Sequence, residues 1–234
     1  MTIFASVIII LLSMLVIASL QLVPGTFSCF YHYALGKTSS KKAGDRSLSF
    51  VLGTEIFVSL IWILLLITLS LLDPIVDIYS APVFLVTSGI IFAEAIAFLL
   101  FYFRRSNCTS LFISRKIAAT LQTRARKASS RSDAIALGFF AGLPELIFTL
   151  PLYFISAIIL LNTPSIPRVP IIVFYIIFAT LPLFAIHIAY HNDQNLASIT
   201  RFRTKLKPFI RIIIPIIYAA IALLAINLGV SNHG

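Results

Sequence analysis

Six apolar runs, each long enough to cross a lipid bilayer, constrain this chain more than any other feature of its sequence. A helix of about 20 apolar residues spans the roughly 30 Å hydrocarbon core of a membrane. The runs are continuous, whereas the strands of a membrane β-barrel alternate apolar and polar residues. We therefore expect an all-α, polytopic membrane protein with six transmembrane helices, at about residues 2–23, 48–72, 82–103, 134–161, 170–190 and 208–228.

The composition excludes a water-soluble globular domain. Hydrophobic residues make up 59% of the 234 residues and charged residues only 11%, which is too little charge to cover a soluble surface. The first apolar run has no Lys or Arg ahead of it and is longer than the core of a secretory signal, so we expect it to remain as a helix. Residues 1–234 are predicted to form a single transmembrane domain.

The net charge of +10 is distributed in a way that indicates membrane topology. Seventeen of the 18 Lys and Arg residues lie in or beside the first, third and fifth connections, and only Arg168 lies elsewhere. Such loops face the cytoplasm by the positive-inside rule, which places both termini outside. We expect a multi-pass protein of a prokaryotic inner membrane that contacts lipid and not nucleic acid, and homo-oligomerisation is left open.

The longest polar stretch, residues 104–133, is a basic cytoplasmic connector. Leu111, Ile117, Leu121 and Ala125 recur in it at helical spacing among basic residues. This pattern is typical of an amphipathic helix lying on an anionic membrane surface. A solvated connector is an equally good interpretation.

Two weak internal similarities suggest a duplication, in different registers. The first joins KKAGDRSLSFVLG (41–53) and RKASSRSDAIALG (126–138) at a constant offset of 85. Both segments lead into helices that are expected to run from inside to outside. A cytoplasmic helix start could produce this similarity by convergence.

The second similarity pairs Pro24 with Pro144 and Tyr33 with Tyr153. It matches the first expected helix with the fourth, so the chain would be a three-plus-three duplication. Units of three helices are inverted relative to each other in the membrane, a recurring transporter design. We prefer this register, with repeats at about 1–103 and 134–234 flanking the connector 104–133.

Three acidic residues lie within the expected spans: Glu55, Glu94 and Glu145. A charge at the bilayer centre costs roughly 2.5–3.5 kcal/mol on insertion scales, so each should face the bundle interior or a wet cavity. Such acids bind ions or solutes in transporters. The alternative is that each is a neutral acid that hydrogen-bonds a Ser or Thr on a neighbouring helix.

The fourth apolar run contains Pro144 beside Glu145, with Thr149 and Pro151 following. A proline inside a helix leaves one carbonyl without its usual donor and kinks the helix. In a membrane, protein groups or water must satisfy that carbonyl, and Thr149 and Glu145 are near enough in sequence to help. Pro24-Gly25 is the matching break in the first run. We expect the helices at 2–23 and 134–161 to be broken there.

Small residues predict two close helix contacts. Gly138 and Gly142 form a small-xxx-small face in the fourth run. Gly89, Ala93 and Ala97 form a similar seam beside Glu94. Such faces let the backbones of neighbouring membrane helices approach.

Signals for a metal or an enzyme are weak. His187 and His191 are four residues apart and could share one helix face to bind a metal with Asp193, but an interfacial polar cap is the preferred interpretation. The sequence has no H-E-x-x-H motif and no Lys within a span for a Schiff base. We therefore expect no enzyme and no cofactor.

Two segments carry a resemblance to a known family: LVPGTFSCFYHYALGKTSSKKAGDRSLSFVLGTEIF (22–57) and ALGFFAGLPELIFTLPLYF (136–154). They resemble the first and fourth helices of the lysine-exporter superfamily of small amino-acid and metabolite exporters. Pro24-Gly25, the later Gly53 with Glu55, and Pro144 stand in the places of that family's motifs. The resemblance implies a six-helix exporter, although Glu145 stands where the family usually has Lys.

The sequence thus predicts a secondary transporter that exports a small polar solute or cation, with protons entering in exchange. The contrasting hypothesis is a non-transporting membrane scaffold whose basic face, residues 104–131, binds a partner or anionic lipid. Convergence of the glutamates on a polar cavity would favour transport. The residues expected to form the solute or ion site are Pro24, Gly25, Glu55, Glu94, Pro144, Glu145 and Thr149.

Overall fold

The computed structural model describes residues 2–21, 40–73, 80–102, 120, 123–124, 130–163, 167–191 and 196–231. The elements within these ranges are helical, without a strand. They are α1 (Thr2–Gln21), α3 (Ser40–Leu72), α4 (Ala81–Ala97) with the π-helical turn η1 (Phe98–Tyr102), α6 (Arg131–Gly142), the 3-10 turn η2 (Leu143–Glu145), α7 (Leu146–Asn162), α8 (Arg168–His191) and α9 (Leu196–Ser231).

Six stretches are long and apolar enough to cross a membrane, which confirms the predicted all-α, six-span class. They are Ile3–Gln21, Gly44–Leu72, Ala81–Leu100, Arg131–Asn162, Arg168–Ile188 and Ile212–Ser231. Their bounds agree with the six apolar runs of the sequence. The fourth span combines α6, η2 and α7.

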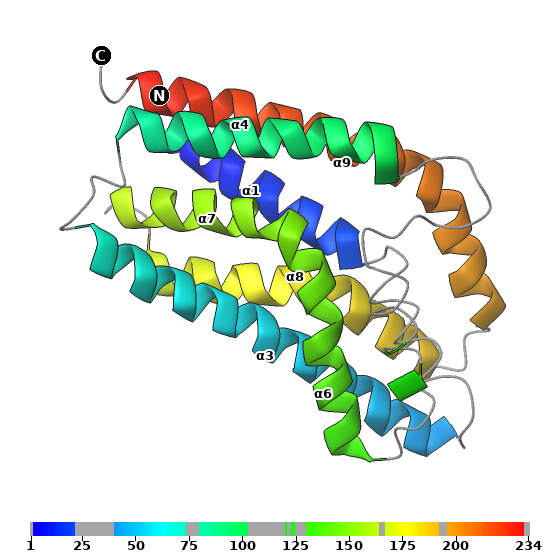
Figure 1. Cartoon of the computed structure of the whole chain (residues 1–234). Coiled ribbons are helices and arrows are strands. Elements are labelled where there is room, and N and C mark those ends of the chain that lie inside the picture. Colours follow the sequence, from blue (N-terminus) through cyan, green and yellow to red (C-terminus); the bar gives the residue numbers. More distant parts are fainter. Residues whose placement is uncertain are drawn as a thin grey trace.

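The helices form a bundle in which α4 lies along α9, and α3 lies along α8, with α1 and α7 between these pairs (Figure 1). The start of α1 and the end of α9 lie at one end of the bundle, whereas α3 and α6 begin at the other end (Figure 1). This arrangement agrees with the predicted relative topology, in which both termini share one side. The connector 104–133 lies outside the described residues except for Thr120, Thr123, Arg124 and residues 130–133, so its predicted amphipathic helix stays a prediction.

The bundle interior is rich in aromatic side chains, and its outer surface is apolar. Trp62, Tyr153, Tyr175, Tyr218 and Phe98 are all buried. Large apolar side chains on every spanning helix are exposed, as expected for surfaces that face lipid acyl chains.

The α3–α6 crossing brings two backbones into direct contact. A Cβ atom on Gly53 would lie 2.1 Å from the carbonyl oxygen of Ile135, and one on Gly138 would lie 2.0 Å from that of Phe50. Only glycine fits at either position. The hydroxyl of Thr54 lies between the same helices, 3.2 Å from the carbonyl oxygen of Phe50 and 3.3 Å from that of Gly138.

The predicted small face of the fourth span is confirmed at this crossing. A Cβ atom on Gly142 would lie 2.4 Å from the ring of Phe57, so Gly142 also makes room for α3. The close approach of α3 and α6 therefore extends over slightly more than one turn of α6, from Gly138 to Gly142.

The contacts of the two glycines are reciprocal. Gly53 and Gly138 are 85 positions apart, and so are their contact residues Phe50 and Ile135. Both helices begin at the same end of the bundle and cross there (Figure 1). The contact joins equivalent positions of the two segments at the offset of 85, and a duplication in that register stays a prediction. The inverted-repeat register stays a prediction, because Pro24 and Tyr33 lie outside the described residues.

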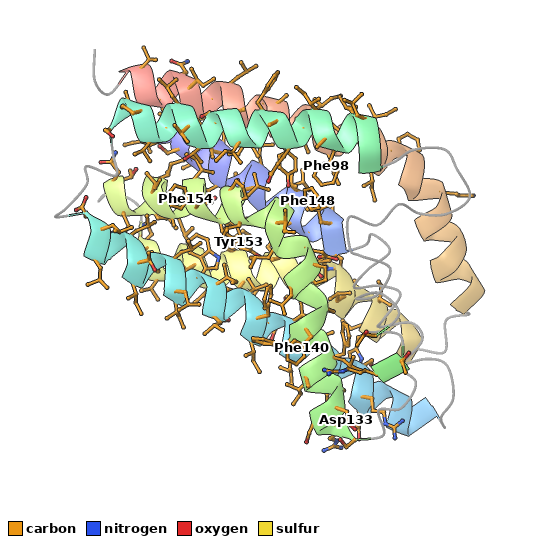
Figure 2. The ribbon with its side chains drawn as sticks, viewed as in Figure 1. Phe98, Asp133, Phe140, Phe148, Tyr153 and Phe154 are labelled. Carbon is orange, nitrogen blue, oxygen red and sulfur yellow. The ribbon has the colours of Figure 1, made fainter. Side chains whose placement is uncertain are left out.

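The N-terminus of α6 is fixed by polar contacts at the end of the bundle where Figure 2 labels Asp133. The backbone N–H of Asp133 donates to the Ser130 hydroxyl at 3.1 Å, and the backbone N–H of Ser130 donates to the Asp133 carboxylate at 3.0 Å, which is a capping box. Arg131 also forms an ion pair with Asp45 of α3. The capping box satisfies backbone N–H groups that a helix start leaves free.

The predicted close-packing seam on α4 is wrong. A Cβ atom on Gly89 would meet nothing within 4 Å, and Ala93 is exposed. The face of α4 that packs on α9 instead carries Phe84, which lies 2.7 Å from where a Cβ atom on Gly229 would be. Small size permits close packing on a helix face but does not decide which face meets a neighbour.

Candidate functional site: a helix break and the buried polar groups around it

The fourth span is broken at Pro144, as predicted. α6 ends at Gly142, residues Leu143–Glu145 form a 3-10 turn, and α7 begins at Leu146. The two helices run in different directions on either side of the turn (Figure 1). Pro144 has no backbone N–H, so the chain closes a tighter turn in which the N–H of Leu146 donates to Leu143.

The carbonyl groups near the break are bonded by side chains. The Thr149 hydroxyl donates to the carbonyl of Glu145 at 3.1 Å, which is not one of the carbonyls that Pro144 and Pro151 leave without a donor. Tyr218 of α9 donates its hydroxyl to the carbonyl of Phe148 at 2.8 Å. α7 then continues through Pro151 without interruption.

Glu145 ends the 3-10 turn and points partly into the protein. Its side chain is half-buried, with Oε2 fully buried. It interacts electrostatically with Tyr153, two turns along α7. The break thus places a half-buried carboxyl group inside a membrane span.

Glu55 makes its contact elsewhere, between α3 and α8. The Thr180 hydroxyl donates to Oε1 of Glu55 at 3.2 Å. The same hydroxyl lies 3.1 Å from the carbonyl oxygen of Ile176 and 3.2 Å from that of Ile177. The hydroxyl has one proton, which these three oxygens share. Glu55 thus makes a bond between two helices, as expected if its role is to hold the helices together.

Glu94 on α4 is a third, separate case. Its Oε2 is buried and has no hydrogen-bond partner among the residues described here. In those parts of the chain, no three His, Cys, Asp or Glu side chains come close enough to hold a metal ion. Glu55, Glu94 and Glu145 therefore do not form a common carboxylate cluster.

The remaining predicted residues add little to this site. His187 forms a hydrogen bond through Nδ1 with the Ser47 hydroxyl of α3, and the side chain of His191 lies outside the described residues. Pro24 and Gly25 also lie outside them. The site that the described residues form consists of the break at Pro144, Glu145 and Thr149 and the groups that surround it.

Sequence reasoning missed an aromatic cluster beside the break. Trp62 of α3, Tyr153 of α7 and Tyr175 of α8 are packed together in the bundle interior, where Figure 2 shows Tyr153. Ring centroids are 4.8 Å apart for Trp62 and Tyr175, 5.6 Å for the two tyrosines, and 6.1 Å for Trp62 and Tyr153. Trp62 meets both tyrosine rings edge to face, a geometry that stabilises aromatic pairs, whereas the two tyrosine rings are tilted relative to each other.

The cluster also carries buried polar atoms. Trp62 Nε1 is buried and has no hydrogen-bond partner among the described residues. The buried hydroxyls of Ser156 on α7 and Tyr175 on α8 lie beside each other. The only sequence signal was the single Trp of the chain within an apolar run.

A separate groove opens between α3, α4 and α7. It has a volume of about 490 Å³, and its lining is almost entirely apolar. None of the three glutamates lines it. The lining residues are Leu65, Pro82, Val83, Val86, Thr87, Ile90, Leu150, Pro151 and Phe154.

No protein-family model, curated protein or solved structure matches the chain.

Proposed function

We propose that this chain is a secondary transporter that exports a small polar solute or cation across a prokaryotic inner membrane in exchange for protons. The observation that carries the proposal is the 3-10 turn at Pro144–Glu145 inside a membrane span, with Oε2 of Glu145 buried. Transporter sites are often built from such discontinuous helices, because their unwound backbone can replace the hydration shell of a solute or ion.

The position of Glu145 supports a functional role over a purely structural one. A carboxyl group inside the hydrocarbon region destabilises the protein unless it is needed there or strongly bonded. Glu145 stands at the break itself, where the backbone departs from regular α-helical bonding. A proton that binds and leaves there can change the local charge while the turn changes its geometry.

Glu55 and Glu94 take secondary roles in this proposal. The bond from Thr180 holds Glu55 between α3 and α8, whereas Oε2 of Glu94 has no partner among the described residues. Because the three glutamates lie apart, they fit separate polar positions along a transport path better than a single site with three carboxylates. Both termini are placed outside, because the basic connections define the cytoplasmic side.

The alternative is a membrane scaffold that does not transport. The Glu55–Thr180 bond favours it, because that bond is how a buried acid joins two helices without any transport role. In this alternative the basic connector 104–133 binds a protein partner or anionic lipid, and Glu145 merely packs at a kink.

Flux measurements with matched glutamate variants decide between the two. The purified protein is placed in liposomes under an imposed pH gradient and supplied with a panel of small polar solutes and cations. Glu145→Gln keeps the size of the side chain and removes its charge change. We expect normal folding with proton-linked flux abolished, and a weaker loss in Glu55→Gln.

Asp73→Asn provides the control, because Asp73 is an exposed acid just beyond the last turn of α3. Its flux should equal that of the unaltered protein. Equal flux in Glu145→Gln would remove this residue from the mechanism. No proton-linked flux of any solute in the unaltered protein would favour the scaffold.

A further inference from the structure

The apolar groove between α3, α4 and α7 lies within the membrane-spanning part of the protein. Val86 and Ile90 line it from α4 and are exposed, so the groove is open to the surrounding bilayer. Leu150 and Phe154 line it from α7, where Figure 2 labels Phe154. A molecule that enters this groove therefore comes from the bilayer and has an apolar body.

Glu94 lies at one end of the groove. It follows Ile90 by four residues and Thr87 by seven on α4, so the three side chains share one helix face. Because α4 and α7 run in opposite directions (Figure 1), this end of the groove is the one nearer to the start of α7. Oε2 of Glu94 is buried and has no hydrogen-bond partner among the residues that the structure describes. The apolar groove thus leads to a carboxyl group.

A backbone carbonyl of α7 is the second polar group at this end. Pro151 lines the groove and lacks an N–H, so the carbonyl of Ile147, four residues earlier, loses its regular helical donor. The hydroxyl of Thr87 does not replace that donor, because it donates to the carbonyl of Val83 at 2.7 Å. The carboxyl group and this carbonyl both need a partner that donates hydrogen bonds.

The chemistry of these two groups specifies a cation. An ionised carboxylate and a carbonyl accept hydrogen bonds and cannot donate them. α4 and α7, both described in full, contain no Lys or Arg that could neutralise Glu94 from within the site. A protonated amine supplies both a positive charge and N–H donors. A lipid acyl chain would fill the groove but would leave the carboxyl group unbonded.

We propose that the groove and Glu94 form a lateral binding site for an amphipathic organic amine. The apolar body of the ligand lies between α3, α4 and α7, and its ammonium group binds the carboxylate of Glu94. The ligand reaches the site from the bilayer, because the groove opens to lipid. The site is separate from the break at Pro144, and binding there does not require proton-linked transport. A chain that does not transport would still bind the amine.

Three ligands with the same apolar body test the charge requirement: phenylbutylamine, phenylbutanol and phenylbutyrate. Binding is measured at neutral pH by equilibrium dialysis against the protein in nanodiscs of phosphatidylcholine. Empty nanodiscs of the same lipid correct for partition into the bilayer. We expect saturable binding of the amine, weaker binding of the alcohol and no binding of the carboxylate. Amine binding that is absent, or no stronger than that of the alcohol, would overturn the proposal.

Variants of Glu94 test its role directly. Glu94→Gln keeps the size of the side chain and removes its charge, so the affinity for phenylbutylamine should fall at least about tenfold. The affinity for phenylbutanol should stay the same. Glu94→Asp retains the charge and should bind the amine more tightly than Glu94→Gln does. The control Asp73→Asn removes an exposed carboxyl group outside the groove and should bind the amine as the unaltered protein does. Unchanged amine affinity in Glu94→Gln would contradict the role of Glu94.

Val86→Trp tests whether the ligand lies in the groove. Val86 is 64% exposed and lines the groove, so a larger side chain there fills the groove without entering the core. Binding of both phenylbutylamine and phenylbutanol should be lost. The matched control is Val173→Trp on α8, which is 49% exposed and lies outside the groove, and it should leave both affinities unchanged. Normal amine binding in Val86→Trp would show that the amine binds elsewhere and would overturn the site.

Discussion

The two parts of the fourth span, α6 and α7, meet their neighbours in opposite ways. α6 packs on α3 with backbone against backbone at Gly53 and Gly138, and its first turn is closed by a capping box. α7 begins after the 3-10 turn and carries the buried hydroxyl of Ser156, which lies beside the hydroxyl of Tyr175 on α8. One membrane crossing therefore contains a part packed backbone against backbone and a part with buried polar side chains.

This difference separates stability from function within one helix. The contacts of Gly53 and Gly138 are reciprocal and hold α3 and α6 together. Buried polar groups within a membrane span are unfavourable, and proteins tolerate such groups mainly at functional sites. The 3-10 turn between the two parts lets α7 change direction without disturbing the packing of α6, as mid-helix turns of this type often do.

The largest effect that the comparison predicts is on stability, from Gly138→Ala. The added Cβ would lie 2.0 Å from the carbonyl oxygen of Phe50, so the helices must move apart. Overpacking of this kind costs about 1–3 kcal/mol, and more when backbone atoms are involved. We expect a large fall in Tm and in the yield of folded protein in detergent.

Gly89→Ala is the matched control, because a Cβ there would meet nothing within 4 Å. Alanine favours the helix by about 0.8–1.0 kcal/mol, so Tm should stay equal or rise slightly. Gly53→Ala should resemble Gly138→Ala, and the double variant should cost less than their sum, because the helices separate only once. Full additivity would argue against a shared contact.

The next prediction concerns α7 and the break. Pro144→Ala restores an N–H that can bond to the carbonyl of Phe140, so the 3-10 turn should become regular α-helix. We expect Tm to be kept or raised, and proton-linked flux to be lost if the turn forms the solute site. Pro151→Ala is the control within the same span, because α7 is already continuous at that residue. Normal flux in Pro144→Ala would show that the break serves packing alone.

The sequence predicted the parts of this molecule that local chemistry decides. The length of the apolar runs predicted the six spans, and the missing N–H of Pro144 predicted the break in the fourth span. It failed where tertiary packing decides: Gly89 was expected at a contact but faces open space. Trp62, Tyr153 and Tyr175 belong to three helices, and nothing in an apolar run indicates which side chains of separate helices will meet. The reciprocal contact of Gly53 and Gly138 likewise became visible only in the structure.

A moderate effect is expected at the first turn of α6. Ser130→Ala removes the hydroxyl that accepts from the N–H of Asp133. Loss of such a cap costs about 1 kcal/mol. Tm should fall by less than in Gly138→Ala, and flux should be unaffected because the cap lies at the opposite end of α6 from the break. Ser130→Asp, which retains a capping oxygen, should recover most of the lost stability.

The smallest effect is expected for the ion pair between Arg131 and Asp45. The two side chains are 70% and 52% exposed, so solvent screens their attraction. Exposed pairs typically contribute about 0.2–1 kcal/mol, and salt reduces this further. A double-mutant cycle with Arg131→Ala and Asp45→Ala, measured by unfolding at low and at high salt, should give a small coupling that disappears at high salt. A large, salt-independent coupling would mean that the ion pair stabilises the α3–α6 contact together with the glycines, and the backbone contact alone would no longer account for the stability of α6.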